Sequence, residues 1–346
     1  MNLKQLSEHL GLSQTTVSRA LNGYPEVSEK TRLRVAAAAR HYNYRPNARA
    51  TGLATGKASA IGHVIPVLSR DDVVNPIFGE FMAGASSVYS ANGYELMLTV
   101  AHSENEADIY HSLKAKGAVD GVIVHSPQKK DHRVQLLQEI GLPFVIHGRV
   151  TDCEQSYSWV DFDNEGAFQQ ACKLLLDLGH RRIALINGPA TLNFAWLRLK
   201  GYQAALAAAD IPCSESLISN GILTELYGYE TALSMLDMGD PPTAMIVSSY
   251  VVALGVKSAI VQAGLTVGND ISIIIHDDEL SFFNNHGDVP QFTATRSPVN
   301  KAGEIAAQML LDIIQQPHIE PQNHLLEARL TIGASTSSPA QPRVVS

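Results

Sequence analysis

The chain has 346 residues, 45% of them hydrophobic and 17% charged, and a formal net charge of −8 at pH 7. Such a composition is typical of a folded protein long enough for two or three domains. Three cysteines without a CxxC spacing predict neither a disulfide framework nor a zinc site, and no cofactor or metal is expected. No signal-peptide pattern and no apolar run of about 18 residues is found, which favours a cytoplasmic protein without a membrane partner.

Charge is distributed unevenly along the chain. Residues 1–59 carry nine basic and three acidic side chains, a local charge of +6, so residues 60–346 carry −14. A basic N-terminal segment on an acidic protein indicates a polyanion as the partner of that segment. A solvated basic helix face would be the alternative on charge alone.

The first 46 residues predict three short helices, at 3–10, 14–22 and about 29–43. Gly11 can end the first helix, while Ser13 and Ser28 can cap the second and third. Two short helices joined by three residues form a helix-turn-helix. The apolar positions expected to form its core are Leu3, Leu6, Leu10, Val17, Ala20, Leu21, Leu33, Val35 and Ala39.

Polar residues remain on the outer face of the second predicted helix. An amide such as that of Gln14 can pair with adenine, and Arg19 can donate two hydrogen bonds to guanine in a major groove. Hydroxyl and basic side chains suit phosphate contacts, which position a domain without reading sequence. The phosphate contacts expected on this ground are Ser18, Lys30, Thr31 and Arg32.

The stretch from Leu3 to Ala50, with LSQTTVSRALN, VSEKTR and NYRPNARA, closely resembles the DNA-binding headpiece of the LacI/GalR family of bacterial transcription regulators. The resemblance implies base contacts by Gln14, Thr15 and Arg19. Backbone contacts are implied for Ser18, Asn22, Thr31 and Asn47.

Residues 47–59 fall where this family has a hinge helix that orders on DNA and inserts a leucine into the minor groove. Leu53 occupies that position. The insertion costs a few kcal/mol of base stacking, which the contacts of bent DNA offset. Gly52 and Gly56 weaken an isolated helix, so a flexible linker remains the alternative.

From residue 60 onward, short β-branched runs alternate with helical stretches. Helices are expected near 77–92, 105–116 and 132–140. Two consecutive series of this kind predict two doubly wound α/β subdomains, with a ligand between them at the carboxyl ends of the strands. The strands are expected at 60–67, 94–100, 121–126 and 143–148 in the first series, and at 158–162, 181–186, 244–249 and 270–275 in the second.

Residues 60–335 also resemble the periplasmic-binding-protein-like core of the same family, in NPIFGE, VDFDNEGA, LGHRRIALINGP and FTATRSPV among other stretches. The expected N-subdomain covers about 60–157 and 292–322. The expected C-subdomain covers about 158–291 and 323–335, followed by a disordered tail at 336–346. No GxSxG, Walker, HExxH or GxGxxG motif is found, so no catalytic residue is expected.

Pocket residues follow from the resemblance. Arg198 is expected to meet ligand hydroxyls or a carboxylate through its planar guanidinium, and Asp277 to accept from sugar hydroxyls. For the aromatic candidates, packing in the core is an equal alternative. The other candidates are Asn75, Phe78, Asp163, Asn164, Phe194, Trp196 and Tyr250.

Two departures from the family pattern bear on the ligand. Ser249-Tyr250 stands where most members have Asn-Asp, and Ile275-His276 replaces a Gly-Tyr pair. A small sugar or glycoside is therefore expected without further identity.

The function expected is a homodimeric regulator, a repressor of genes for sugar or glycoside uptake or breakdown, which binds a palindromic double-stranded operator. Residues 77–92 form a candidate dimer helix, with an apolar face that its own core could also need. The alternative is an exported or cytosolic protein that binds or processes sugars with the same core fold.

Overall fold

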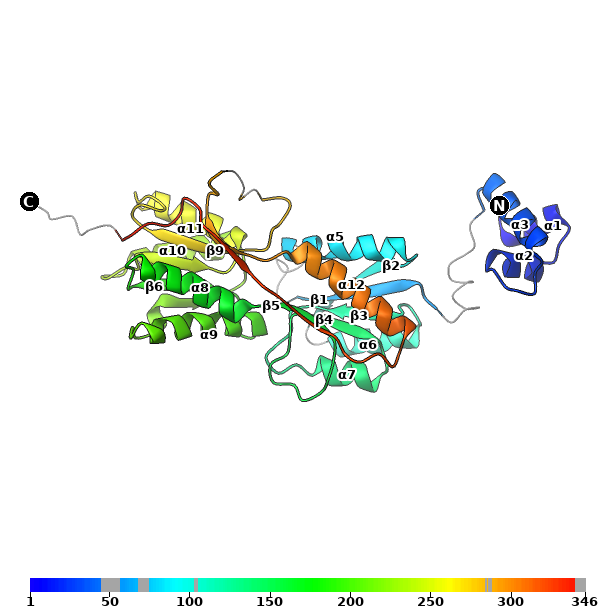
Figure 1. Ribbon diagram of the computed structural model, residues 1–346, viewed down its shortest axis with the longest axis horizontal. Coiled ribbons are helices and arrows are strands. Elements are labelled where there is room, and N and C mark those ends of the chain that lie inside the picture. Colours follow the sequence, from blue (N-terminus) through cyan, green and yellow to red (C-terminus); the bar gives the residue numbers. More distant parts are fainter. Residues whose placement is uncertain (45–56, 68–74, 103–104, 284, 286–287, 340–346) are drawn as a thin grey trace, which may run out of the picture. The chain divides into compact units, whose positions relative to one another are not determined.

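The chain has two compact units, Met1–Ser59 and Ala60–Ser346, and the described residues of the first form three short helices (Figure 1). The computed structural model describes residues 1–44, 57–67, 75–102, 105–283, 285 and 288–339. Asn47, Leu53 and most of the expected hinge lie outside these residues. In the described part, no helix is both long and apolar enough to span a membrane.

The headpiece confirms the predicted helix-turn-helix. Its helices are α1 (Leu3–Leu10), α2 (Gln14–Leu21) and α3 (Glu29–His41). Ser13 caps α2 by accepting from the Thr16 amide at 3.0 Å, and Ser28 caps α3 in the same way through Thr31. Gly11 ends α1 with a φ of 63°, in the left-handed region that glycine adopts without strain.

Leu6, Val17 and Val35 are fully buried at the centre of the headpiece. Leu33, which the apolar pattern assigned to this core, is instead 62% exposed. It lies two positions before Val35, which turns it by about 200° around the helix axis and onto the outer face of α3. That part of the core prediction was wrong.

The first sheet of the larger unit has the order β11-β5-β4-β3-β1-β2, with all neighbouring strands parallel. Helices α5 (Pro76–Ala91) and α12 (Val299–Gln315) cover one face, and α6 (Glu106–Ala115) and α7 (Arg133–Glu139) cover the other (Figure 1). The strands are β1 (Ala60–Val67), β2 (Glu95–His102), β3 (Gly121–Val124), β4 (Phe144–His147), β5 (Trp159–Phe162) and β11 (Asn323–Leu326).

The second sheet has the order β12-β10-β9-β8-β6-β7, parallel except for the edge strand β12. Alternating strand residues feed two hydrophobic clusters, one under α8 (Asn164–Asp177) and α9 (Asn193–Ala208), the other under α10 (Glu225–Leu236) and α11 (Tyr250–Gln262). Two doubly wound α/β subdomains are thereby confirmed. The strands are β6 (Ile183–Asn187), β7 (Ile218–Asn220), β8 (Ala244–Val247), β9 (Ser272–Asp277), β10 (Thr293–Arg296) and β12 (Arg329–Thr331).

The expected subdomain limits need correction at three strands. Both β5 and β11, assigned to the C-subdomain, belong to the first sheet, whereas β10, assigned to the N-subdomain, belongs to the second. Backbone hydrogen bonds from Ile146 and Gly148 to the carbonyls of Ser158 and Val160 hold β5 beside β4. A buried strand has the same local pattern in either sheet, so the sequence could not assign its partner.

The expected disordered tail also begins too early. Ser337 donates its amide to the Ser272 hydroxyl at 3.1 Å, and its carbonyl accepts from His180 Nε2 at 2.9 Å. The Thr336 hydroxyl lies 2.8 Å from that of Thr293. Residues 336–337 are thus bound to the second subdomain, because their hydroxyl and backbone groups find partners there.

Helix α5, the candidate dimer helix, buries most of its apolar face in the core of its own subdomain. Phe81, Ala85 and Tyr89 pack under α12 in the core of the first sheet. The two helices cross so closely that a Cβ at Gly84 would collide with the Asn300 carbonyl. This face therefore has little surface left for a partner.

Candidate functional site

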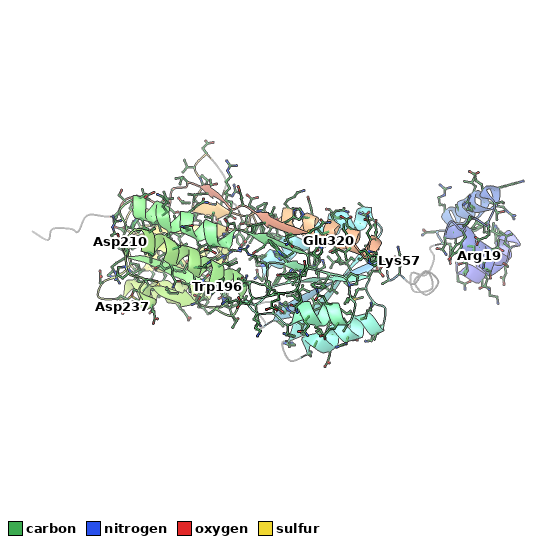
Figure 2. The ribbon with its side chains drawn as sticks, turned by 60° about the horizontal axis from the view of Figure 1, so that its bottom comes forward. Arg19, Lys57, Trp196, Asp210, Asp237 and Glu320 are labelled. Atoms are coloured by element: carbon green, nitrogen blue, oxygen red, sulfur yellow. The ribbon has the colours of Figure 1, made fainter. Side chains whose placement is uncertain are left out.

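One face of α2 presents a continuous polar surface. Gln14, Thr15 and Arg19 are exposed, opposite the buried Val17 and Ala20. Figure 2 shows Arg19 on the headpiece. Among the described residues its guanidinium has no hydrogen-bond acceptor, so its donors are available to an external group.

Neighbouring residues of the expected DNA surface are tied into the headpiece. Asn22 donates to the Ser18 carbonyl at 3.0 Å, and Arg32 to the Gly23 carbonyl at 3.4 Å. The Thr31 hydroxyl lies 2.9 Å from that of Ser28 at the start of α3, while Lys30 is exposed. The N-terminus of α3, where Ser28 caps the Thr31 amide, also carries the positive end of the helix dipole, which favours an anion.

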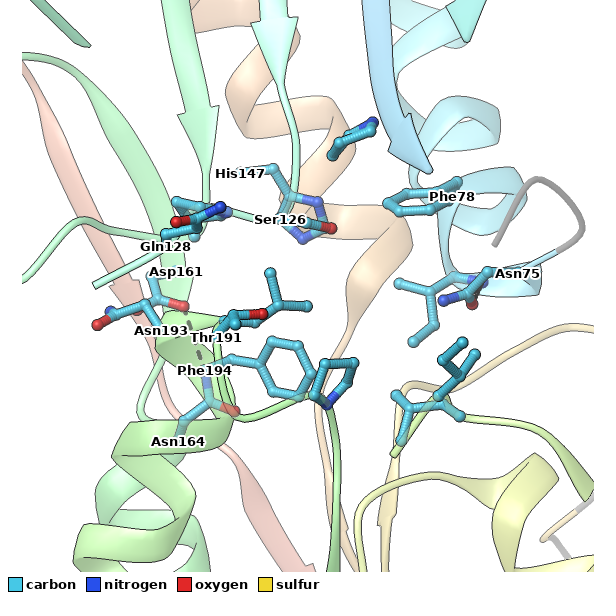
Figure 3. A pocket seen from close by; sticks show the side chains of 18 of the residues that line it. Asn75, Phe78, Ser126, Gln128, His147, Asp161, Asn164, Thr191, Asn193 and Phe194 are labelled. Carbon is cyan, nitrogen blue, oxygen red and sulfur yellow. Dashed lines mark hydrogen bonds between the residues drawn. The ribbon is translucent and has the colours of Figure 1, made fainter. Parts of the chain in front are cut away.

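A pocket with a cavity volume of about 390 Å³ lies between the two sheets of the larger unit (Figure 3). Residues at or after the carboxyl ends of β1, β3, β4, β5, β6, β7 and β9 line it. This is the position in which open α/β sheets bind ligands. Of the expected residues, the lining includes Asn75, Phe78, Asn164, Phe194 and Arg198.

Arg198 is the fixed cation of the pocket. Its Nε donates to Asn164 Oδ1 at 2.7 Å and its Nη1 to the Ser248 carbonyl at 2.8 Å, so the side chain is held from both α8 and the segment that follows β8. The guanidinium lies over the Phe168 and Phe194 rings, with its carbon 5.0 and 4.7 Å from their centroids. Burial lowers the pKa of Arg198 to about 10, which leaves it charged at neutral pH.

Two buried carboxyl groups face this cation. Burial raises the pKa of Asp161 to about 6, against the opposing effect of Arg149, whose Nε lies 3.1 Å from Asp161 Oδ2. Burial raises the pKa of Asp278 to about 7, although Arg198 favours its ionised form. In their ionised form, these carboxylates can accept hydrogen bonds from a ligand rich in hydroxyls.

Four residues expected at the pocket do not line it. Asp163 instead caps α8 by accepting from the Gly166 amide at 3.0 Å. Trp196, labelled in Figure 2, is half-buried with Lys129 Nζ 4.7 Å above its ring. Tyr250 stacks on Phe283 within the core of the second subdomain.

Asp277 is the fourth expected residue that does not line the pocket. Its carboxylate accepts from the Glu279 amide at 3.0 Å and lies 3.5 Å from Arg296 Nε, turned towards the loop after β9. Successive residues of an extended chain point to opposite sides, and Asp278 lines the pocket in its place. The sequence predicted Asp277, and its neighbour Asp278 lines the pocket instead.

Three of the pocket residues that were not expected from the sequence share one signal. His147, Asp161 and Asp278 each stand near or directly after the carboxyl end of a buried strand. A polar residue at such a position could have been taken as a pocket candidate on that ground alone. Further polar lining comes from Ser126, Gln128, Thr191 and Asn193 (Figure 3).

Hydrogen bonds connect the two subdomains at separate points. Asn193 Nδ2 donates to the Arg149 carbonyl at 2.8 Å, and Thr151 donates to Asn193 Oδ1 at 2.7 Å. Elsewhere, Glu80 on α5 accepts from the Ser281 amide at 2.9 Å. A rotation between the subdomains would have to break or rearrange these contacts.

A buried ionic cluster supports the loop after β3. Arg133 donates to Asp131, to Glu106 Oε1 at 2.9 Å and to the carbonyls of His125 and Ser126. Ser126 has a φ of 50°, a strained conformation for a residue with a side chain. The cluster stabilises that conformation at the edge of the pocket.

Comparison with protein families gives two matches. Residues 2–47 match the model of bacterial regulatory proteins of the lacI family, and residues 172–336 match a periplasmic binding protein-like domain. Over 343 residues the chain is 43% identical to the HTH-type transcriptional regulator AglR of Rhizobium meliloti (strain 1021), covering 99% of this chain and 96% of that protein. The CelR regulator of Thermobifida fusca is 30% identical over 96% of this chain and 97% of its own length.

Solved structures give the same result. A complex of the regulator CelR with cellobiose has a TM-score of 0.72 and 29% identity, covering 97% of this chain and 99% of that one. The lac repressor dimer bound to operator and the anti-inducer ONPF has a TM-score of 0.83 and 27% identity, with the same coverage. These relatives are transcription regulators, and they include both segments described above, the headpiece and the two-subdomain core.

Proposed function

Because the chain belongs to the LacI family of bacterial regulatory proteins, we propose that it is a cytoplasmic repressor of genes for sugar or glycoside uptake or breakdown, without enzymatic activity. One observation carries the proposal. The same chain has a helix-turn-helix with an exposed Arg19, unpartnered among the described residues, and a polar pocket between two subdomains.

DNA binding is assigned to the headpiece, in a homodimer on a palindromic operator; the lac repressor relative is a dimer bound to operator. Gln14, Thr15 and Arg19 read bases, and Ser18, Asn22, Lys30, Thr31 and Arg32 lie along the backbone. Asn47 and Leu53 keep their proposed contacts to the backbone and the minor groove. A two-fold dimer places two such surfaces on two half-sites, which requires a palindrome.

The effector is proposed to be a neutral sugar or glycoside, in line with the cellobiose complex of a relative. Arg198 and the carboxyl groups of Asp161 and Asp278 bind its hydroxyls, and Phe78 and Phe194 supply apolar contact. Asn75 and Asn164 complete the polar set. An exported sugar-binding protein or a sugar-processing enzyme would have no use for the headpiece.

Binding is proposed to change the angle between the subdomains and thereby the spacing of the two headpieces. Contacts such as Glu80 with Ser281 and Asn193 with Arg149 join the halves that would move. A coupling of about 1–3 kcal/mol would change DNA affinity roughly 5- to 150-fold.

The proposal is tested by a gel-shift assay with the full-length protein and the DNA that flanks its own gene. We expect a sequence-specific shift that maltose, sucrose, trehalose or cellobiose releases. The logarithm of the DNA association constant should fall linearly with the logarithm of the salt concentration, with a slope of about −0.9 for each phosphate neutralised. A shift equal on random DNA, or insensitive to salt, would contradict it.

Effector affinity is expected to depend on pH through Asp278. As an ionised carboxylate Asp278 accepts from two hydroxyls, and it loses that form as the pH falls through about 7. The dissociation constant of the releasing sugar should therefore rise as the pH is lowered from 8 to 6, approaching tenfold per pH unit below 7. Calorimetric titrations measure it.

The matched variant is Asp278→Asn, which keeps the shape of the side chain without its titration. Its affinity should change by no more than about twofold between pH 8 and 6, the remaining change coming from Asp161, whose pKa is raised by burial to about 6. Asp277→Asn, which changes the neighbour that faces away from the pocket, should keep a pH dependence of the same steepness, moved to lower pH because the Asp277 charge helps to raise the pKa of Asp278. An unchanged pH profile in Asp278→Asn would contradict the assignment.

A further inference from the structure

Three histidines, two of them buried and one half-buried, and a buried tyrosine form a continuous hydrogen-bonded chain that ends at the pocket. His63 on β1, His125 after β3 and His147 at the end of β4 come from three adjacent strands. His63 Nε2 lies 3.1 Å from the Tyr89 hydroxyl, and His63 Nδ1 lies 3.1 Å from His125 Nε2. His125 Nδ1 lies 3.1 Å from His147 Nδ1. His147 lines the pocket (Figure 3).

The surroundings of the chain keep all three imidazoles neutral. His63 and His125 are fully buried, and the rings of Phe78 and Phe81 contact the cluster, with Phe81 stacked on His147 at 4.2 Å. Burial lowers the pKa of His63 to about 3 and of His147 to about 4, and the pKa of His125 lies well below its ordinary value.

The nearest charged side chain, Arg133, also lowers the pKa of the cluster. The Arg133 guanidinium donates to the His125 carbonyl and disfavours a second positive charge on that ring. The carboxylates of Glu106 and Asp131 are bound to Arg133. In the described residues no carboxylate is hydrogen-bonded to a ring nitrogen of the three histidines.

A neutral imidazole has one donor and one acceptor nitrogen. The hydrogen bonds can therefore all point either from Tyr89 towards His147 or from His147 towards Tyr89. In the described residues, the Tyr89 hydroxyl has no acceptor other than His63 Nε2. Because the hydroxyl is buried, directing it away from His63 would leave its proton unpartnered, at a considerable cost. Tyr89 therefore donates to His63, His63 Nδ1 donates to His125, and His125 Nδ1 donates to His147.

We infer that this chain fixes His147 as the Nε2–H tautomer and makes it a specificity-determining hydrogen-bond donor that selects an acceptor oxygen of the bound sugar. His147 Nδ1 is occupied as an acceptor, and Nε2 has no partner in the described residues. The inference rests on the proposed function for its ligand. It adds an obligatory donor to a pocket whose carboxyl groups, Asp161 and Asp278, mainly accept.

The tautomer is tested first in the full-length protein without ligand. Nitrogen-15 labelling of histidine gives separate chemical shifts for protonated and bare ring nitrogens, and the His147→Gln variant identifies the His147 signals by their loss. We expect His147 to show a protonated Nε2 and a bare Nδ1. A protonated Nδ1, or a charged ring at pH 7, would overturn the inference.

A second variant tests the role of the tyrosine as a positioning residue. Tyr89→Phe removes only the hydroxyl that sets the direction of the chain. Both tautomers of His147 should then be populated, which moves its two nitrogen shifts towards each other. Shifts identical to the wild type would show that Tyr89 does not set the tautomer and would overturn that step.

Ligand selection is tested with whichever of maltose, sucrose, trehalose and cellobiose binds in calorimetry. His147→Gln places an amide donor near the Nε2 position and should stay within about threefold of the wild type. His147→Asn keeps an acceptor for His125, but its shorter side chain does not place the amide donor at the Nε2 position, and it should bind about tenfold more weakly. Equal affinities of both variants would overturn the donor role. If no sugar binds, the proposed function fails, while the tautomer result stands independently.

Discussion

Replacing Arg19 by alanine is expected to remove most of the sequence specificity of DNA binding while the headpiece stays folded. Arg19 is exposed on α2, on the face opposite the buried Val17 and Ala20. A bidentate arginine–guanine contact contributes about 1–3 kcal/mol of discrimination, and a dimer has two of them. Operator affinity should therefore fall by roughly 30-fold or more, with little change on random DNA.

Arg40→Ala is the matched control. Arg40 is also exposed and in the headpiece, but it lies in the last turn of α3, and its Nε donates only to the Ala36 carbonyl at 3.4 Å among the described residues. Both variants lose one positive charge, so a difference between them in quantitative gel shifts isolates base reading from general attraction. Equal losses on operator and random DNA would contradict the assignment of Arg19.

Replacing Arg198 is expected to abolish the response to the effector and to leave operator binding intact. The guanidinium is buried, fixed by Asn164 and the Ser248 carbonyl, and paired electrostatically with Asp278 and Asp161. Removing one partner of a buried charge cluster costs about 3–5 kcal/mol, part of it in folding stability. Arg198→Ala should weaken effector binding by about 100-fold or more.

Arg198→Lys separates the effect of charge from that of geometry. Lysine keeps the positive charge, but it has no planar guanidinium that could donate to Asn164 and to the Ser248 carbonyl at the same time. It should also fail to respond at effector concentrations that saturate the wild type. Lys200→Ala, on the same helix but exposed and paired with Glu165, is the control and should respond normally. The measurement is operator occupancy against effector concentration, and a normal response in both Arg198 variants would contradict the proposal.

These two predictions place the two functions on separate parts of the chain. Arg19 variants should still bind the effector, and Arg198 variants should still bind the operator. Coupling between the sites is a property of the whole protein, because it requires a motion that links the subdomains. The pH dependence of Asp278 and the donor role of His147 concern only the effector site.

The sequence alone determined the local structure and the family. Ser13 and Ser28 specify where α2 and α3 begin, and Gly11 specifies where α1 ends, because capping involves groups within a few residues of each other. The alternation of β-branched runs with helical stretches was enough to predict two α/β subdomains with parallel sheets. The headpiece motifs were enough to indicate the LacI family, because they are contiguous stretches of the chain.

Only the tertiary structure decided which elements and side chains meet. Strands β5, β10 and β11 join the sheet opposite to the one expected, since their partners are set by backbone hydrogen bonds to distant strands. Asp278 rather than Asp277 reaches the pocket because of the way in which the chain leaves β9. The row of hydrogen bonds from Tyr89 through His63 and His125 to His147 joins residues that are far apart in sequence. No local sequence pattern encodes these contacts. Local interactions are readable from neighbouring residues, whereas the composition of a pocket depends on long-range packing.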